Sequence, residues 1–319
     1  MSRPHLARVR RCAYFIVALA ISGLSVQCSS GMDTREMFDD GDEIALRYIA
    51  AMPDVDAKDG DGLTPLIYAA QVGSAVAVRR LLERHASTDA RDPYGFTPLQ
   101  LAARQGAVAA VRELVYGGAD LNARGGDADG TALDEAIIQN HPDVVRLLLL
   151  SGADVNAGDR WGQTGLHYLA LVPPAASVML PLLVSAQANV DAQDARGWAP
   201  IHVAASVDNF NFVAAVSLFN ENLNVRALSG VTALDIALRN RADVSADALW
   251  RAGAAATSPT QLPALFEAAK LDEATRVENI LAHGADVKKR FAEKTAFQIA
   301  VESGSTRVAP ILAAAEAGK

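Results

Sequence analysis

Histidine, cysteine and carboxylate side chains are the groups through which this chain could bind a metal or carry out acid–base chemistry. The 319 residues include six histidines and two cysteines, and the cysteines are Cys12 and Cys28. A zinc site needs several His, Cys or carboxylate ligands at short, regular spacings, and no histidine stands with such ligands at that spacing. We therefore expect neither a metal site nor a bound cofactor.

The sequence also lacks the motifs of nucleotide-binding proteins and hydrolases. It contains no phosphate-binding glycine loop, no nucleophile elbow and no His-Glu-x-x-His motif. The segment from Gly125 to Gly130 resembles a calcium loop but lacks the distal glutamate that completes one, so we interpret it as a structural turn. We expect no catalytic residues and a protein that is not an enzyme.

The composition indicates a folded chain whose main partner is not a nucleic acid. Half of the residues are apolar and 21% are charged, with a formal net charge of −8. Disordered chains combine low hydrophobicity with high net charge, and this composition therefore excludes a disordered chain. Because phosphate binding needs clustered Lys and Arg, the acidic balance argues against nucleic acid.

The N-terminus has the pattern of an export signal. Residues 1–11 contain four arginines and no acid, and an uncharged, mostly apolar run follows from Cys12 to Val26. A basic region followed by an apolar run of about 7–15 residues is typical of a secretory signal. The run is shorter than the ~20 residues that usually span a membrane, which favours a cleaved signal over an anchor.

The end of this signal resembles the cleavage site of a bacterial lipoprotein, in which a cysteine is lipidated and becomes the new N-terminus. The segment reads Leu-Ser-Val-Gln-Cys-Ser-Ser, and its cysteine is Cys28. The resemblance implies a signal peptide at 1–27, a lipidated Cys28 and a tether at 28–33. It places the protein in the bacterial cell envelope, in the periplasm and lipid-anchored to the outer membrane. Cleavage near residues 27–31 without a lipid and an uncleaved anchor remain as alternatives.

The rest of the chain repeats with a period of about 33 residues. The segment Gly-Leu-Thr-Pro-Leu-Ile-Tyr-Ala-Ala around Thr64 returns as Gly-Phe-Thr-Pro-Leu-Gln-Leu-Ala-Ala around Thr97. A leucine-rich segment that ends in Gly-Ala-Asp, an apolar residue, Asn and Ala repeats in the back half of the units, for example at 147–157. An internal period of this length is typical of stacked repeats. The position that Thr64 and Thr97 occupy, which we call the threonine slot, is filled in later copies by Thr131, Thr164, Ala199 and Thr232.

This pattern strongly resembles the ankyrin repeat family, over roughly residues 34–319. The resemblance implies an all-α solenoid of stacked helix-turn-helix units with projecting β-hairpin loops and about eight repeats, including degenerate caps. We count a half-unit at 34–58, six clear units from Asp59 to about Ala256, and two degenerate units that run to the C-terminus. Because each helix has only about 8–10 residues, neighbouring units must stabilise it. We expect one repeat domain at 34–319.

Individual residues of the repeat have expected local roles. The threonines can cap the first helix of a unit, and a proline suits its first turn, as at Pro65. Glycines can end helices in the left-handed conformation, and Asn140, Asp208 and Arg241 take that place in three units. Aspartates that open the loops before the first helices favour turns by bonding their own backbone. They are Asp59, Asp92, Asp159 and Asp194.

Two histidines are expected to steady loops, and two segments are expected to depart from the regular repeat. His167 and His202 stand where ankyrin repeats often carry a histidine that steadies neighbouring loops. The fourth unit has a 35-residue period and contains Val-Pro-Pro at 172–174, which implies a longer connection between its helices. The loop from Thr257 to Gln261 has lost the pattern, so we expect the stack to be least regular there.

The loops before the first helices, which we call fingers, are where we expect a partner to bind. Ankyrin stacks present their fingers and first-helix face as a concave surface, and solenoids bind through such surfaces. Trp, Tyr and Arg dominate interface energies, and two of the three tryptophans fall on fingers, whereas Trp250 takes a core position. The predicted partner-binding residues are Asp61, Leu63, Tyr94, Phe96, Arg104, Gln105, Gln139, Trp161, Gln163, Arg196 and Trp198.

The expected function is protein–protein interaction by an exported, membrane-anchored ankyrin repeat protein. The partner is another protein, and the membrane is contacted only through the N-terminal segment. The alternative is an immunity or inhibitor protein that neutralises a toxic envelope enzyme. The basic run at 288–290, with Lys294, is either a solvated terminal finger or a site for an acidic partner.

Overall fold

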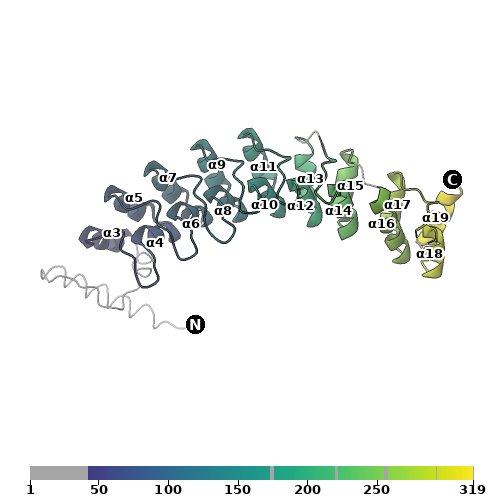
Figure 1. Ribbon diagram of the computed structural model, residues 1–319, viewed down its shortest axis with the longest axis horizontal. Coiled ribbons are helices and arrows are strands. Elements are labelled where there is room, and N and C mark those ends of the chain that lie inside the picture. The colour runs from purple at the N-terminus through teal and green to yellow at the C-terminus, as the bar shows by residue number, and fades with distance from the viewer. Residues whose placement is uncertain (1–41, 173–175, 220–221, 255–257, 292, 319) are drawn as a thin grey trace. The chain divides into compact units, whose positions relative to one another are not determined.

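The computed structural model describes residues 42–172, 176–219, 222–254, 258–291 and 293–318 (Figure 1). Cys28 and the expected signal and tether at 1–33 lie outside these ranges. Seventeen helices make up the regular secondary structure of the described ranges. They are α3 (Asp42–Ala51), α4 (Pro65–Gln71), α5 (Ala75–Glu83), α6 (Pro98–Arg104), α7 (Val108–Tyr116), α8 (Ala132–Ile138), α9 (Pro142–Leu150), α10 (Gly165–Leu171), α11 (Ala176–Ser185), α12 (Pro200–Ser206), α13 (Phe210–Val216), α14 (Ala233–Asn240), α15 (Asp243–Arg251), α16 (Ser258–Lys270), α17 (Ala274–Ala282), α18 (Ala296–Glu302) and α19 (Val308–Glu316).

Contacts between residues divide the chain into two compact units, with the boundary between Asp154 and Val155. The described part of unit 1 contains the helices α3 to α9, and unit 2 contains α10 to α19. In unit 1 the first helices α4, α6 and α8 pack in one row, and the second helices α3, α5, α7 and α9 pack in another (Figure 1). Each first helix also packs on the second helix that follows it.

Unit 2 repeats this arrangement over its own residues. Its first helices α10, α12, α14, α16 and α18 pack in sequence, and α11, α13 and α15 form the matching row of second helices. The last pair, α18 and α19, packs on the pair α16 and α17. The leucine that follows the threonine slot lies in the core of both units. Leu66, Leu99 and Leu133 in unit 1, and Leu166 and Leu234 in unit 2, are at most 2% exposed.

The first helices begin as the sequence predicts. Thr64 Oγ1 accepts a hydrogen bond from the backbone N–H of Ile67, at 3.4 Å, and Pro65 occupies the first turn. Thr97, Thr131, Thr232 and Thr295 cap their helices through the same bond. These caps satisfy an N–H group that the start of a helix leaves without an intrahelical acceptor.

The ends of the first helices confirm the expected left-handed residues. Gly106 has φ +71°, and Asn140, Asp208 and Arg241 stand at +60°, +56° and +59°. At Gly106 space as well as φ requires glycine, because a Cβ there would lie 2.5 Å from Nδ1 of His141. Asn and Asp tolerate this conformation better than most residues, and Arg241 carries the larger strain.

The fingers differ from the expectation in one respect, since the described ones contain no β-strand. Their only β-type pairings are the isolated bridges Gly125–Gly130 and Phe291–Lys294. Where the pattern is lost after residue 257, α16 begins at Ser258 and runs for 13 residues, so helix replaces the expected finger there. In the parts of the chain that are described, no helix is both long and apolar enough to cross a membrane.

Candidate partner-binding surface

An aspartate shapes each regular finger by accepting two backbone hydrogen bonds. Asp92 Oδ1 accepts from the N–H of Tyr94, at 3.0 Å, and from that of Phe96, at 2.8 Å. Asp59, Asp159 and Asp194 make the same two bonds in their own fingers. The expected role of these aspartates is confirmed. Backbone bonds close the same turns, as from the Asp92 N–H to the carbonyl of Phe96, at 3.1 Å. The carboxylate and the backbone together therefore hold the finger residues two and four positions after each aspartate in place.

The third residue of the first helix connects one repeat to the finger of the next. Gln100 Oε1 accepts from the N–H of Thr97, at 2.8 Å, and its Nε2 donates to the carbonyl of Gly130, at 2.7 Å. His167 makes both contacts in unit 2: its Nδ1 accepts from the Thr164 N–H, at 3.1 Å, and its Nε2 lies 2.9 Å from the carbonyl of Trp198. The expected loop-steadying role of His167 is confirmed.

The buried histidines are held neutral by their surroundings. Burial lowers the pKa of His167, and the hydrogen bond to the Trp198 carbonyl opposes this effect. Burial also lowers the pKa of His202, whose Nδ1 accepts from the Ala199 N–H. Since Nδ1 accepts in both rings, the single proton of each neutral imidazole is on Nε2. His167 is thus a structural donor and acceptor, whereas His202 accepts through Nδ1 and its buried Nε2 has no hydrogen-bond partner among the described residues.

In unit 1 the predicted binding residues line two neighbouring fingers and the first-helix face. Tyr94 is 72% exposed at the tip of its finger. Phe96 is half-buried under the guanidinium of Arg104, which lies 5.6 Å from the ring centroid. Arg104 also lies 3.8 Å from a carboxylate oxygen of Glu135, and burial raises the pKa of that carboxyl, against the opposing charge of Arg104. Of the other predicted residues, Asp61, Gln105 and Gln139 are exposed and Leu63 is half-buried.

In unit 2 the fingers carry a tryptophan beside a hollow, which we call the Trp161 surface. Trp161, Gln163, Asp194, Ala195 and Arg196 line this hollow of about 290 Å³. Trp161 is 49% exposed, and the N–H of Ala195 donates to its carbonyl, at 2.8 Å, which joins the two fingers.

Arg196 is fixed at the edge of this hollow. Its Nε and one terminal nitrogen donate to Asp194 Oδ2, at 2.9 and 2.7 Å. Its guanidinium lies 4.5 Å from the ring centroid of Trp198, which is half-buried. Trp198 is therefore partly a packing residue, whereas Trp161 is the more available aromatic side chain.

The sequence pattern did not single out three residues that the structure adds. Arg160 stands over Trp161 at 5.6 Å from its ring, Ala195 lines the hollow, and Glu135 faces Arg104. Arg160 could have been found from its place beside Trp161 in the finger. Trp250 takes the core position expected of it, with 8% exposure and its ring stacked 4.3 Å from that of His283.

The basic run of unit 2 is only partly free of acidic neighbours. Lys288, Lys289 and Arg290 are exposed, whereas Lys294 Nζ donates to Glu302 Oε2, at 2.6 Å. In the described ranges no group of three His, Cys, Asp or Glu side chains could hold a metal ion.

Comparison with known proteins identifies the repeat. A family model described as Ankyrin repeats (3 copies) matches residues 37–125, and one described as Ankyrin repeat matches residues 130–160. Unit 2 has the same helix pairing among its own helices. The expected all-α ankyrin-repeat solenoid is therefore confirmed. Repeat stacks of this kind typically present extended surfaces for binding other proteins.

The chain is similar to short stretches of larger proteins. It is 34% identical to the tyrosine-protein kinase Shark of Drosophila melanogaster over 108 residues, which are 34% of this chain and 11% of that protein. It is 35% identical to human Rabankyrin-5 over 134 residues, or 38% of this chain and 11% of that protein. The human Ankyrin repeat and SOCS box protein 6 is 39% identical over 92 residues, 28% of this chain and 22% of that protein. The chain thus spans between about a tenth and a quarter of these relatives.

Proposed function

We propose that this chain is an exported, membrane-anchored protein without enzymatic activity that binds another protein, with the Trp161 surface of unit 2 as a main contact. One observation carries the choice of surface. A half-exposed tryptophan stands beside a hollow whose walls are fixed by the turns of Asp159 and Asp194. A binding site that is rigid before its partner arrives loses little side-chain and loop entropy on binding.

The chemistry of this surface suits a protein. Exposed Trp with neighbouring Arg is the combination that contributes most to protein interfaces. Arg160 lies over the indole ring of Trp161, and Arg196 lines the same hollow as Trp161. The hollow accepts an apolar side chain against Trp161, and the exposed parts of the guanidinium groups can accept carbonyl or carboxylate groups at its rim. In unit 1, Tyr94 and the Phe96–Arg104 pair offer a further contact of the same kind.

Capture from envelope extract with three versions of the full chain tests this proposal. Trp161→Ala removes the anchor side chain but leaves the backbone bonds of the finger, and Leu150→Ala removes an equally apolar, 82% exposed side chain from the end of α9. We expect a protein that wild type and Leu150→Ala retain and that Trp161→Ala binds more weakly, by about 1–3 kcal/mol.

Two results of this experiment would count against the proposal. Equal retention by all three versions would place the binding site elsewhere, and absence of any retained protein would argue against a protein partner in the envelope. Capture of a toxic envelope enzyme would favour the inhibitor alternative.

The export and anchoring parts of the proposal rest on the order of residues 1–30 alone, where basic residues precede an apolar run and the sequence Cys-Ser-Ser. We expect cleavage before Cys28, with a lipid on its sulfur and its amine. Mass spectrometry of the native protein measures this directly. An unmodified N-terminus at Ser29 or beyond would exclude the lipid, and retention of Met1 would favour an uncleaved anchor.

A further inference from the structure

The second helices of unit 1 pack in one row (Figure 1), and each carries an exposed arginine at the same place. In α5, Ala77 and Leu81 are buried against the neighbouring helices, and Arg79 lies halfway between them in the sequence. Its side chain therefore points away from the packed side of the helix. Counting two residues from the first buried residue of each described helix gives a row made of Arg47, Arg79, Arg112 and Arg146.

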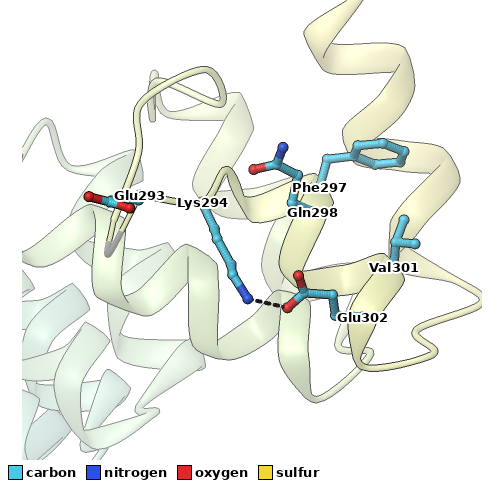
Figure 2. Close-up of a pocket in the computed structure, with 6 residues that line it drawn as sticks. All are labelled: Glu293, Lys294, Phe297, Gln298, Val301 and Glu302. Carbon is cyan, nitrogen blue, oxygen red and sulfur yellow. Dashed lines mark hydrogen bonds and ion pairs between the residues drawn. The ribbon is translucent and has the colours of Figure 1, made fainter.

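The second helices of unit 2 hold no arginine at this place. Counted from the first buried residue that is described in α11, α13, α15 and α17, the corresponding residues are Pro181, Ala214, Asp247 and Glu278. The basic run of unit 2 is also different, because Lys294 there is paired with Glu302 (Figure 2). The repeat itself does not require a charge at this place, so the arginine row is a property of unit 1.

The acids of α5, α7 and α9 leave the middle of this row uncompensated. Arg79 donates to Glu113, at 2.6 Å, and Arg80 to Glu83, at 2.8 Å. The remaining acid of these helices, Asp143, lies in the first turn of α9, where the helix dipole favours a carboxylate.

Arg112 and Arg146 are the two arginines of the row that stay available. Both side chains are exposed, and neither has an ion pair or a hydrogen bond within the described ranges. Although the chain as a whole has a formal charge of −8, this part of its surface is positive and suits an anionic partner.

One turn after these two arginines, α7 and α9 each end in a large apolar side chain. Tyr116 is 79% exposed and Leu150 is 82% exposed, more than any other large apolar side chain in the described part of unit 1. Because residues four positions apart lie on the same face of a helix, each stands beside its arginine. Arginine beside exposed leucine and an aromatic residue is typical of helices that lie on a membrane surface.

Unit 1 is also the part of the chain that follows the expected lipid anchor. The segment 28–41 separates Cys28 from the start of α3, and a chain of that length spans at most about 50 Å. A lipid on Cys28 would hold unit 1 within that distance of the bilayer, where a weak surface contact becomes effective because it is intramolecular in character.

We propose that the arginine face binds the anionic phospholipids of the membrane to which the chain is anchored. This inference rests on the anchoring proposed above. With neighbouring helices 8–10 Å apart, the row crosses about 25–30 Å of surface, and lipid phosphates can move in the bilayer plane to meet each guanidinium. Tyr116 and Leu150 enter the boundary between headgroups and acyl chains. The arginine face consists of Arg47, Arg79, Arg112, Tyr116, Arg146 and Leu150.

A nitrobenzoxadiazole label at residue 116 of the full, lipid-carrying chain tests this inference. From Ser29 onward the chain has no cysteine, so Tyr116→Cys provides one labelling site. Tyr94→Cys is the matched control, a tyrosine of unit 1 that is 72% exposed on a finger. On vesicles of phosphatidylcholine with about a third phosphatidylglycerol, we expect the label at residue 116 to emit at shorter wavelength and to be quenched by brominated acyl chains. The label at residue 94 should behave as it does in water.

Charge reversal tests the arginines directly. Arg112→Glu with Arg146→Glu should lower the shielding of residue 116 at least tenfold. Arg124→Glu with Arg239→Glu changes the net charge by the same amount at two exposed arginines outside the arginine face and should preserve the shielding. Circular dichroism establishes that each variant is folded.

The same experiment separates failure of the arginine face from failure of the anchor. A chain without an introduced cysteine that takes up label would have a free thiol and contradict the anchor. Cys12→Ser with Cys28→Ser would then keep residue 116 as the labelled position, and the test of the face proceeds on anionic vesicles.

Four results would overturn the inference. They are a label at residue 116 that stays in water on anionic vesicles, equal shielding on pure phosphatidylcholine, shielding that persists after reversal of Arg112 and Arg146, and equal loss in the control pair. Shielding of residue 116 by envelope proteins without vesicles would assign the face to an acidic protein instead of a lipid surface.

Discussion

The aspartates that open the fingers contribute little acidic surface to a partner. Oδ1 of each aspartate accepts hydrogen bonds from two backbone N–H groups, and Oδ2 of Asp194 accepts one from the Arg196 guanidinium. Desolvation raises the pKa of Asp194, but the hydrogen bonds from Arg196 and Trp198 outweigh it, so the pKa is lowered overall. Asp194 therefore stays ionised but is buried and paired with Arg196, so Arg160 and Arg196 are the exposed charges beside Trp161 that a partner meets.

The buried histidines make the stability of unit 2 depend on pH. The pKa of His167 and that of His202 are lowered from the ordinary 6.5 by burial. Above pH 6.5 both rings are neutral whether the chain is folded or unfolded, so their contribution is intact. As the pH falls below 6.5 the unfolded chain takes up protons that the folded chain excludes, and stability is lost until the pH reaches the folded pKa.

The variant His167→Gln with His202→Gln should flatten this dependence. Gln100 makes the same pair of contacts in unit 1, so glutamine can replace His167 without loss of the bonds and without a titrating group. Urea unfolding of wild type and variant at pH 7.5 and pH 5.5 measures the difference. An equal loss of stability in both proteins would show that these two histidines are not its source.

Residue-level predictions from the sequence succeeded where the interaction is local. Thr64 bonds an N–H three residues away, and Asp92 bonds N–H groups two and four residues away. Contacts that depend on the neighbouring repeat could not be located in this way. The bond from Gln100 to Gly130 spans 30 residues, and the hollow at Trp161 exists only because the finger of Asp194 packs beside that of Asp159.

Among the elements, two glycines at helix ends allow the cost of backbone strain to be separated from the cost of crowding by a new side chain. Gly106 and Gly118 both lie in unit 1, with φ +71° and +81°. A Cβ at Gly118 meets nothing within 4 Å, whereas a Cβ at Gly106 overlaps the ring of His141. That ring also bonds the carbonyl of Arg104 through Nε2, at 3.1 Å.

Gly118→Ala should cost about 1–2 kcal/mol of unfolding free energy through its left-handed φ alone. Gly106→Ala should cost more, because the His141 ring must also move away from the Arg104 carbonyl. Chemical denaturation of the two variants beside wild type gives both values. Equal losses would mean that His141 moves aside freely and that strain alone requires glycine at residue 106.

Element boundaries followed the sequence wherever the threonine slot is present and departed from it where the slot is absent. First helices such as α4 and α6 have seven residues, but α16 starts earlier and has 13. Its extra turn contains Ser258 and Pro259, residues that suit the beginning of a helix. The repeat pattern shows that the finger is missing before α16, but it does not predict that a longer helix replaces the finger.

At the scale of the whole molecule, both units repeat the same buried positions, whereas the exposed positions of the fingers differ from one repeat to the next. From α4 to α14, the second position after each cap at 64, 97, 131, 164, 199 and 232 is a buried leucine or isoleucine, as at Leu99 and Ile201. The finger tips vary freely, with Asp61, Tyr94, Trp161 and Arg196 at equivalent positions. Repetition therefore predicts the scaffold well, whereas the partner depends on residues that the repeat leaves unspecified.

This division predicts opposite effects for two neighbouring residues of unit 1. Leu99→Ala removes a side chain that is 1% exposed and should cost about 2–5 kcal/mol of unfolding free energy, through lost burial and the cavity left behind. Tyr94→Ala removes a side chain that is 72% exposed, and its finger keeps the Asp92 bonds through the backbone. It should change stability by less than about 0.5 kcal/mol while it weakens partner binding. Thermal melts of both variants, followed by binding measurements on the protein captured with wild type, compare the two effects. If Tyr94→Ala lowered the melting temperature as far as Leu99→Ala does, the finger tips would be part of the scaffold and would not be free to serve as a binding surface.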